Sequence, residues 1–285
     1  MNHLRRAFCY VFFSLALISV PKLHAASPSE MSYDVVVYGA TASGAMAALA
    51  ATRQGMHVVL LEPGTHVGGM LTGGLSATDV GNPNVIGGVA LEFFEQVGRY
   101  YDMPQYGQKV AWRFEPHVGE AILRSMLQVA KVDVRLKERM REKDGVRKSG
   151  ERIISLTTED GTVWKGKVFI DATYEGDLMA ASGVSFAWGR ESIAQYGESL
   201  GGVRAESPGH QFKFKVSAYS GDGKLLPEIS PVTMAPAGSG DHEVQAFNFR
   251  LILTQDPANL IPFPKPNNYD PHEYQLLANY IRGFQ

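Results

Sequence analysis

A glycine turn and an acidic residue further along the chain form the strongest chemical pattern in the sequence. The turn reads Gly39-Ala40-Thr41-Ala42-Ser43-Gly44, and the acid is Glu62. Backbone N–H groups in such a turn, with a helix N-terminus behind them, can bind a pyrophosphate. A carboxylate about 20 residues on can accept hydrogen bonds from ribose hydroxyls. The pattern therefore predicts a dinucleotide-binding unit.

Three elements must position these groups, and the sequence supplies each of them. The β-branched run at 33–38 suits a parallel strand buried on both faces. Residues 45–54 suit a helix that Gly55 ends, and residues 57–61 suit the next strand. Thr41 stands where the dinucleotide motif has its middle glycine. We expect Thr41 either to tolerate the close approach of a pyrophosphate or to offer its hydroxyl to a phosphate.

A glycine-rich segment at 63–79 follows the acid directly. Its pairs Gly68-Gly69 and Gly73-Gly74 let the backbone approach a flat ligand and present N–H donors. A surface linker is the plainer alternative, but linkers are more often charged and poor in Leu and Met. We therefore expect this loop to lie against a ligand.

A second polar turn at 173–179 follows a predicted buried strand at 168–172. Two such turns, far apart in sequence, can contact one extended ligand. Asp171, Glu175 and Asp177 could suggest a cation loop, yet they lack the alternating oxygen ligands and distal glutamate of an EF-hand. We therefore expect no metal.

The remaining patterns indicate scaffold. Helices are predicted at 89–101, 116–131 and 273–284, and strands at 132–136 and 244–254. An Asp-Gly turn between 152–158 and 162–167 predicts a hairpin. Residues 183–240 are rich in Gly, Pro and Ser and are interpreted as strands and loops that face a substrate.

The N-terminus has the three regions of a secretory signal peptide. Arg5-Arg6 is followed by an apolar stretch at 7–20 and a small-residue site at Ala25-Ala26. The apolar stretch is shorter than the about 20 residues that a membrane anchor needs, so no stable anchor is expected after cleavage. The arginine pair also resembles the twin-arginine signal, and both that route and ordinary Sec secretion stay open. We expect a periplasmic or extracellular protein.

Signal removal limits the chemistry of the mature chain. Cys9 is the only cysteine among the 285 residues, so the mature protein has no thiol for disulfide, nucleophilic or iron–sulfur chemistry. Cleavage after residue 25 removes three bases and no acids, which takes the formal net charge from −2 to −5. Such a charge argues against nucleic acid as a partner, and any redox activity needs a bound cofactor.

The glycine turn, the glycine-rich loop and the second polar turn resemble those of the FAD-dependent oxidoreductases with a glutathione-reductase-like nucleotide domain. This group includes flavoproteins similar to the flavin-binding chain of heterodisulfide reductase. Residues 33–62, 63–79 and 169–178 carry the resemblance, which continues more weakly at 189–191, 195–198, 245–250 and 262–266. It implies FAD as cofactor and an α/β fold: a Rossmann-like parallel sheet with an antiparallel β-meander insertion and a partial, mainly β substrate region.

The expected organisation follows from this resemblance. Residues 1–25 are the signal peptide, and 32–182 form the FAD-binding domain with the meander at about 150–168. Residues 183–285 form a substrate or cap region. Family members continue into a C-terminal half that returns to the flavin, so we expect this region to be incomplete.

The expected FAD contacts lie in the glycine turn, at Glu62, in the glycine-rich loop and in the second turn. They are Gly39, Ala40, Thr41, Ala42, Ser43, Gly44, Glu62, Pro63, Gly68, Gly69, Met70, Gly73, Gly74, Ala172, Thr173, Gly176 and Asp177. The candidate catalytic or substrate-binding side chains are His117, Tyr174, Arg190, Asn248 and Arg250. Each of the latter could equally be structural or solvated.

The preferred function is hydride transfer from a small organic molecule to FAD, followed by reoxidation by an acceptor that the sequence does not specify. A saccharide is one conceivable extracellular substrate, among amines, alcohols and acids. An NAD(P)-dependent dehydrogenase is the first alternative, although it needs no second polar turn. A truncated nucleotide-binding module without turnover is the other.

Overall fold

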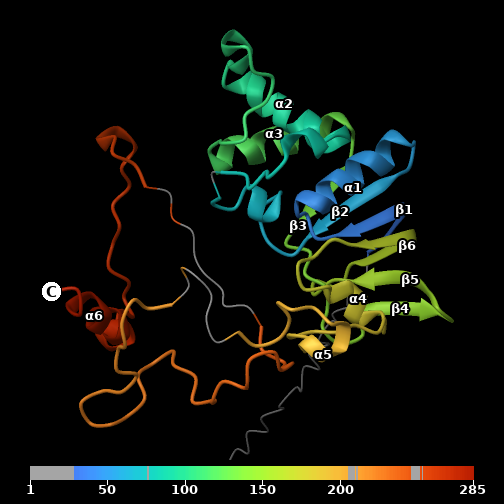
Figure 1. Ribbon diagram of the computed structural model, residues 1–285. Helices are drawn as coiled ribbons and strands as arrows, with labels where there is room; N and C mark the ends of the chain where they lie inside the picture. Colours follow the sequence, from blue (N-terminus) through green and yellow to red (C-terminus); the bar gives the residue numbers. More distant parts are fainter. Residues whose placement is uncertain (1–28, 76, 205–208, 210, 245–250, 252) are drawn as a thin grey trace, which may run out of the picture.

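A single mixed sheet organises the chain (Figure 1). The computed structural model describes residues 29–285 except 76, 205–208, 210, 245–250 and 252, so the predicted signal peptide lies outside the described residues. The sheet has six strands in the order β3-β2-β1-β6-β5-β4. Their bounds are β1 Glu30–Tyr38, β2 Val58–Glu62, β3 Asp133–Leu136, β4 Val146–Ser149, β5 Arg152–Thr157 and β6 Val163–Asp171.

The parallel half of the sheet brings distant turns to one edge. Strands β3, β2, β1 and β6 run parallel, whereas β6, β5 and β4 are antiparallel. Tyr38 pairs with Leu61 on one side and with Asp171 on the other. The residues that follow these three strands therefore lie side by side at their carboxyl ends. This arrangement confirms the predicted Rossmann-like α/β fold.

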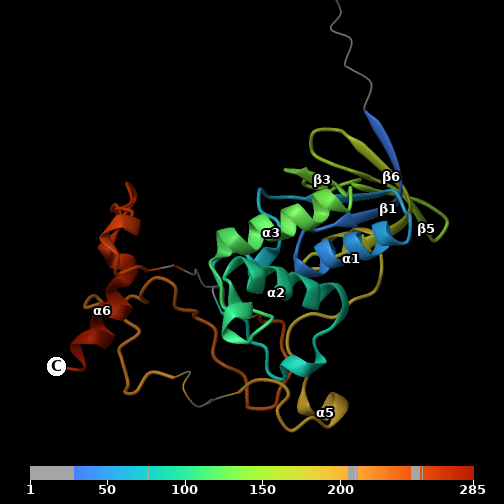
Figure 2. The same ribbon diagram turned by 90° about the horizontal axis from the view of Figure 1, so that it is seen from above.

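Three helices cover one face of the sheet: α1 (Ala42–Arg53), α2 (Gly88–Tyr100) and α3 (Pro116–Val129) (Figure 2). Because side chains alternate across a strand, Val37 and Leu60 pack toward these helices. Val36 and Leu61 pack on the opposite face, in a cluster that includes Trp164. The central strands are thus buried on both faces, as the β-branched sequence predicted.

The meander differs from the prediction in one respect. The sequence predicted a hairpin strand at 162–167 followed by a separate buried strand at 168–172. Instead β6 is continuous, because it pairs with β5 over its first residues and with β1 along its whole length. The prediction that 168–172 is buried was wrong in part, since Val168 is 51% exposed. Strand β4, which completes the meander, was not predicted.

After the sheet the described chain consists of short elements joined by long loops (Figure 1). Its helices are α4 (Asp177–Ala181), α5 (Ile193–Tyr196) and α6 (Gln275–Arg282). The mainly β character expected for 183–285 is not found in the described part of that region, where pairing is limited to isolated bridges such as Arg190 with Asp241. The strand predicted at 244–254 falls largely outside the described residues, whereas α6 confirms the last predicted helix.

Short 3-10 turns connect the larger elements. They are η1 Gly69–Leu71, η2 Pro83–Val85, η3 Met103–Tyr106, η4 Pro257–Asn259 and η5 Pro271–Tyr274. Among the helices of the described residues, none has the length and apolar character needed to cross a membrane.

Candidate functional site

The glycine turn between β1 and α1 is too tight for side chains at its two ends. Gly39 has a φ of 98°, and an added Cβ would lie 2.8 Å from the backbone carbon of Ala172. A Cβ at Gly44 would lie 2.0 Å from the carbonyl oxygen of Gly39. Both positions therefore require glycine, one for its conformation and both for space.

Thr41 has a structural role in this turn. Its hydroxyl donates to the carbonyl oxygen of Ala172 at 2.7 Å and accepts from the amide of Gly44 at 3.2 Å, so it caps α1. The residue is 6% exposed. The expectation that Thr41 offers its hydroxyl to a phosphate is therefore wrong, because the hydroxyl is directed to the protein backbone. The helix begins at Ala42, three residues earlier than predicted, because of this cap.

Glu62 at the end of β2 ties the turn to the following loop. One carboxylate oxygen accepts from the amide of Ala40 at 2.8 Å, and the other accepts from the amide of Gly64 at 2.7 Å. A carboxylate has about four lone-pair positions, so two acceptor positions are left for hydroxyl groups of a ligand. The carboxylate is thus fixed in place and still able to bind a ribose.

The glycine-rich loop runs against the glycine turn, so it is not a surface linker. The amide of Gly68 donates to the carbonyl oxygen of Ala40 at 2.6 Å. Gly68 and Gly69 both have positive φ, of 108° and 55°. The Thr72 hydroxyl donates to the carbonyl oxygen of Val67 at 2.6 Å and closes the loop on itself. The backbone path through this loop therefore depends on its glycines.

The second polar turn is held by its own side chains. The Asp171 carboxylate accepts from the amide of Thr173 at 2.9 Å, from its hydroxyl at 2.7 Å and from the amide of Met179 at 2.7 Å. The Thr173 hydroxyl in turn accepts from the amides of Gly176 and Asp177. Asp171 thus stabilises the turn, and among the described residues there is no group of three or more potential metal ligands.

Tyr174 connects the two segments. Its hydroxyl accepts a hydrogen bond from the amide of Met70 at 2.6 Å. An added Cβ at Gly69 would lie 2.1 Å from that hydroxyl and 3.2 Å from the Cα of Thr41. The glycine turn, the glycine-rich loop and the second turn therefore meet at one place.

A cavity of about 320 Å³ lies where these segments meet. This volume is within the about 300–1,000 Å³ of small-molecule sites. Eight of the predicted site residues line the cavity: Gly39, Thr41, Glu62, Pro63, Gly69, Thr173, Tyr174 and Asp177. The other predicted contacts belong to the same turns but are not among its lining residues: Ala40, Ala42, Ser43, Gly44, Gly68, Met70, Gly73, Gly74, Ala172 and Gly176.

The prediction missed five lining residues: Gly64, Thr65, His66, Arg139 and Glu175. Arg139 adds a cation to a cavity that Glu62, Glu175 and Asp177 make acidic. A signal for Arg139 existed in the sequence, because the strand predicted at 132–136 extends the sheet beside β2. The residues after that strand must then lie near Glu62, which pairs with Leu136.

The other catalytic candidates lie elsewhere or outside the described residues. His117 is exposed in the first turn of α3 and does not line the cavity. Arg190 forms an ion pair with Asp241 beside a different cavity of about 510 Å³. Asn248 and Arg250 fall within the segment that the structure does not describe.

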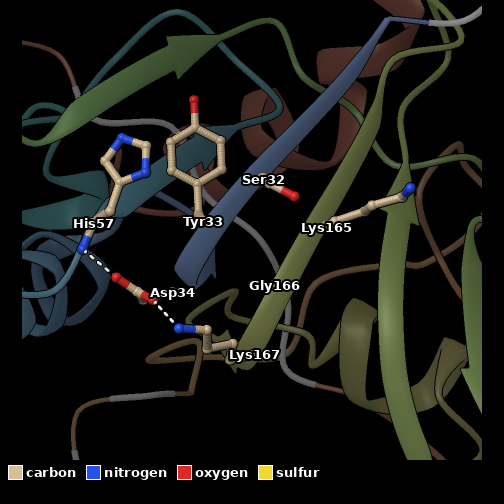
Figure 3. A pocket seen from close by; sticks show the side chains of 7 residues that line it. All are labelled: Ser32, Tyr33, Asp34, His57, Lys165, Gly166 and Lys167. Carbon is tan, nitrogen blue, oxygen red and sulfur yellow. Dashed lines mark hydrogen bonds and ion pairs between the residues drawn. The ribbon is translucent and has the colours of Figure 1, made fainter.

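A third hollow lies toward the opposite ends of the parallel strands, and Figure 3 shows Asp34 there between Lys167 and His57. Lys167 contacts Asp34 at 2.7 Å, and Lys165 contacts Glu30 at 2.6 Å. Asp34 also accepts from the amide of His57 at 2.8 Å. Since both lysines already have carboxylate partners, this hollow is a weaker anion site than the glycine turn.

The fold and the cavity define the class. A glycine turn, a strand-end carboxylate and a second turn that meet at the carboxyl ends of parallel strands are the features of a Rossmann-like dinucleotide-binding protein. The family model described as FAD dependent oxidoreductase matches residues 34–285, so the chain belongs to that family. The family match points to FAD as the cofactor.

Solved structures of flavoenzymes are among the similar folds. L-proline dehydrogenase from P. horikoshii is 13% identical, with 58% of this chain and 59% of that chain covered and a TM-score of 0.41. A geranylgeranyl bacteriochlorophyll reductase-like protein from Thermoplasma acidophilum is 18% identical over 56% and 44%, with a TM-score of 0.39. The flavin-dependent brominase Bmp2 is 18% identical over 57% and 42%, with a TM-score of 0.38.

This chain therefore spans about half the length of the solved structures that it resembles. The comparison with curated proteins gives no significant match.

The residues present fit FAD. Gly39 and Gly69 line the cavity, and the missing side chains let their segments approach Ala172 and Tyr174 closely enough to form it. The first-turn amides of α1 have no partner within the helix, which is where a pyrophosphate binds. Glu62 keeps acceptor capacity for ribose hydroxyls. The FAD family match also favours this assignment over the NAD(P)-dependent alternative.

Proposed function

We propose that this chain is an exported FAD-dependent oxidoreductase that transfers a hydride between a small organic molecule and FAD. The main observation behind this proposal is that three segments distant in sequence meet around Glu62 and Gly39. The hydrogen bond from the Met70 amide to the Tyr174 hydroxyl joins two of them. A cofactor as long as FAD needs contacts from several such segments. When bound, FAD supplies the hydride chemistry.

The residues of the chain bind and orient the cofactor in this proposal. The amides of Ala42 and Ser43, at the positive end of α1, hold the pyrophosphate. Glu62 accepts from the ribose hydroxyls of the adenosine half. Arg139 offsets part of the negative charge that Glu62 and Asp177 place around the cavity.

Tyr174 is the catalytic candidate that we retain beside the cofactor. Its hydroxyl accepts a hydrogen bond from the Met70 amide, and the residue is 54% exposed. In this position the side chain joins the second turn to the glycine-rich loop. We assign it to cofactor binding and to closure of the cavity.

The hydride-transfer proposal is tested by anaerobic mixing of the FAD-loaded protein with saccharides, amines, alcohols and hydroxy acids in turn. We expect one class, with saccharides included as the extracellular option, to bleach the absorbance of the oxidised flavin. Dithionite serves as the positive control for reduction. Bleaching by dithionite but by none of the four classes would contradict the proposal.

Export is supported by the three-region pattern at residues 1–25. We propose that the mature chain begins next to Ala25 or Ala26 in the periplasm or the medium, and N-terminal sequencing of the exported protein tests this. Replacing Arg5 and Arg6 by lysine removes the arginine pair and is expected to block export by the twin-arginine route. Because the positive charge is kept, the same change is expected to leave Sec secretion intact. An uncleaved chain confined to the cytoplasm would contradict export by either route.

A further inference from the structure

One wall of the cavity is fastened to α3 by a pair of charged side chains. Glu120 and Arg124 lie one helical turn apart and form an ion pair at 2.7 Å. The Glu120 carboxylate also accepts from the amide of Val67 at 3.1 Å. The Arg124 guanidinium donates to the carbonyl oxygen of Thr65 at 3.0 Å. The pair thus holds the loop through both an amide and a carbonyl group.

The loop that this pair holds is part of the cavity. Thr65 and His66 line the cavity, and Val67 is fully buried in the core. The Nδ1 atom of His66 lies 3.2 Å from the Glu120 carboxylate. On its other side the loop is bonded to the glycine turn, because the amide of Gly68 donates to Ala40. Residues 65–68 are therefore fixed between α3 and the turn.

The surroundings of Glu120 favour its charged form. Its side chain is 17% exposed, and this burial raises its pKa. Hydrogen bonds from the Val67 amide, His66 and Arg124 outweigh that effect and hold the pKa of Glu120 below its ordinary value. A carboxylate that keeps its charge in a partly buried place is a strong acceptor for a backbone amide.

We propose that Glu120 and Arg124 are a positioning pair that holds residues 65–68 as a preformed wall of the FAD site. This inference rests on the proposed function, since it assumes that the cavity binds FAD. Neither side chain lines the cavity, so the pair acts through the loop and not by touching the cofactor. A wall that is fixed before binding lowers the ordering cost of binding.

Binding of FAD to the cofactor-free protein tests the pair. We expect Glu120→Gln to raise the dissociation constant about tenfold, because the loop must then be ordered on binding. Glu92→Gln is the matched control, since Glu92 forms a comparable two-contact pair with Arg53 that joins α1 to α2 away from the cavity. The control is expected to bind FAD as the wild type does. Equal affinity of Glu120→Gln and the wild type would overturn the proposal.

A charge-swapped double variant separates positioning from helix stability. Glu120→Arg with Arg124→Glu keeps an ion pair on α3 but puts a donor opposite the Val67 amide, which needs an acceptor. We expect the double variant to bind FAD about tenfold more weakly than the wild type, like Glu120→Gln. Recovery of wild-type affinity in the double variant would show that the pair serves only the helix, and would overturn the proposal.

Hydrogen exchange without FAD distinguishes failure of this inference from failure of the proposed function. In the cofactor-free protein we expect the amides of Val67 and Gly68 to exchange faster in Glu120→Gln than in the wild type. Unchanged exchange of these two amides would overturn the proposal that the wall is preformed. If the wild type binds no FAD, the proposed function fails, while the exchange measurement still decides whether the pair fixes the loop.

Discussion

Gly39 is the residue on which the geometry of the site depends most directly. Its φ of 98° suits glycine, and the backbone of Ala172 and Thr173 leaves no room for a Cβ. The close approach of the second turn to the first therefore requires the missing side chain. This requirement links two residues that are more than 130 positions apart.

We predict that Gly39→Ala lowers the free energy of unfolding by about 2–5 kcal/mol, from strain in the left-handed region and from overpacking. Gly55→Ala is the matched control, because Gly55 also has a positive φ, of 81°, yet an added Cβ there meets no described atom within 4 Å. Gly55→Ala is expected to lower the free energy of unfolding by about 1–2 kcal/mol. Urea unfolding of both variants measures the difference, and equal costs would argue against the close approach.

The residues that the sequence predicted and those that it missed differ in physical origin. Gly39 and Glu62 follow from local rules, because a strand, a turn and a helix leave a recognisable pattern in one short segment. Arg139 and His66 reach the cavity only through the register of β3 and the packing of α3. The cap role of Thr41 also depends on Ala172, a distant partner. Such contacts have no signature in a single segment.

At the scale of elements, the register of the parallel strands creates the site. Tyr38 pairs with both Leu61 and Asp171, so the three following turns begin at the same level. The predicted strand type and order of β1 and β2 were confirmed. The continuity of β6 was missed, because the sequence carries no mark at the point where its pairing with β5 ends and its pairing with β1 continues.

Tyr33 lies on β1, away from the carboxyl ends of the parallel strands, and its surroundings predict that stability depends on pH. Its hydroxyl donates to Asp133, and its ring stacks on His57 with centroids 4.5 Å apart (Figure 3). Burial, together with the hydrogen bond to Asp133, raises the pKa of Tyr33 to about 12 from 10.0. The protonated Tyr33 hydroxyl therefore makes its full contribution to the free energy of unfolding below pH 10. This contribution is lost as the pH rises through 12, because Tyr33 ionises at a lower pH in the unfolded chain.

We predict that the free energy of unfolding falls by up to about 2 kcal/mol between pH 10 and pH 12 because of this residue. Tyr33→Phe should flatten that part of the profile, whereas Tyr196→Phe, at an exposed position on α5, should leave it as in the wild type. Chemical unfolding at a series of pH values measures both. A Tyr33→Phe profile as steep as that of the wild type would contradict the assignment.

The whole molecule combines a well-packed nucleotide domain with a loosely packed remainder. Large side chains such as Phe93, Leu60 and Leu123 are fully buried around the sheet. After residue 183, by contrast, large apolar side chains such as Trp188, Leu253 and Phe263 are exposed. The cofactor-binding half could be predicted from the sequence because its patterns are periodic and punctuated by glycine. The region after it has no comparable period, and its mainly β prediction was wrong for the described residues.

The central claim is that the meeting of these three turns binds FAD, and cofactor retention tests it most directly. The purified chain is incubated with excess FAD and, in parallel, with excess NAD, and is then desalted and acid-treated to release bound ligand for chromatography. We predict about one FAD per chain, with the absorbance of a protein-bound flavin before release, and no retained NAD. A chain that retains NAD but no FAD, or neither ligand, would contradict this account.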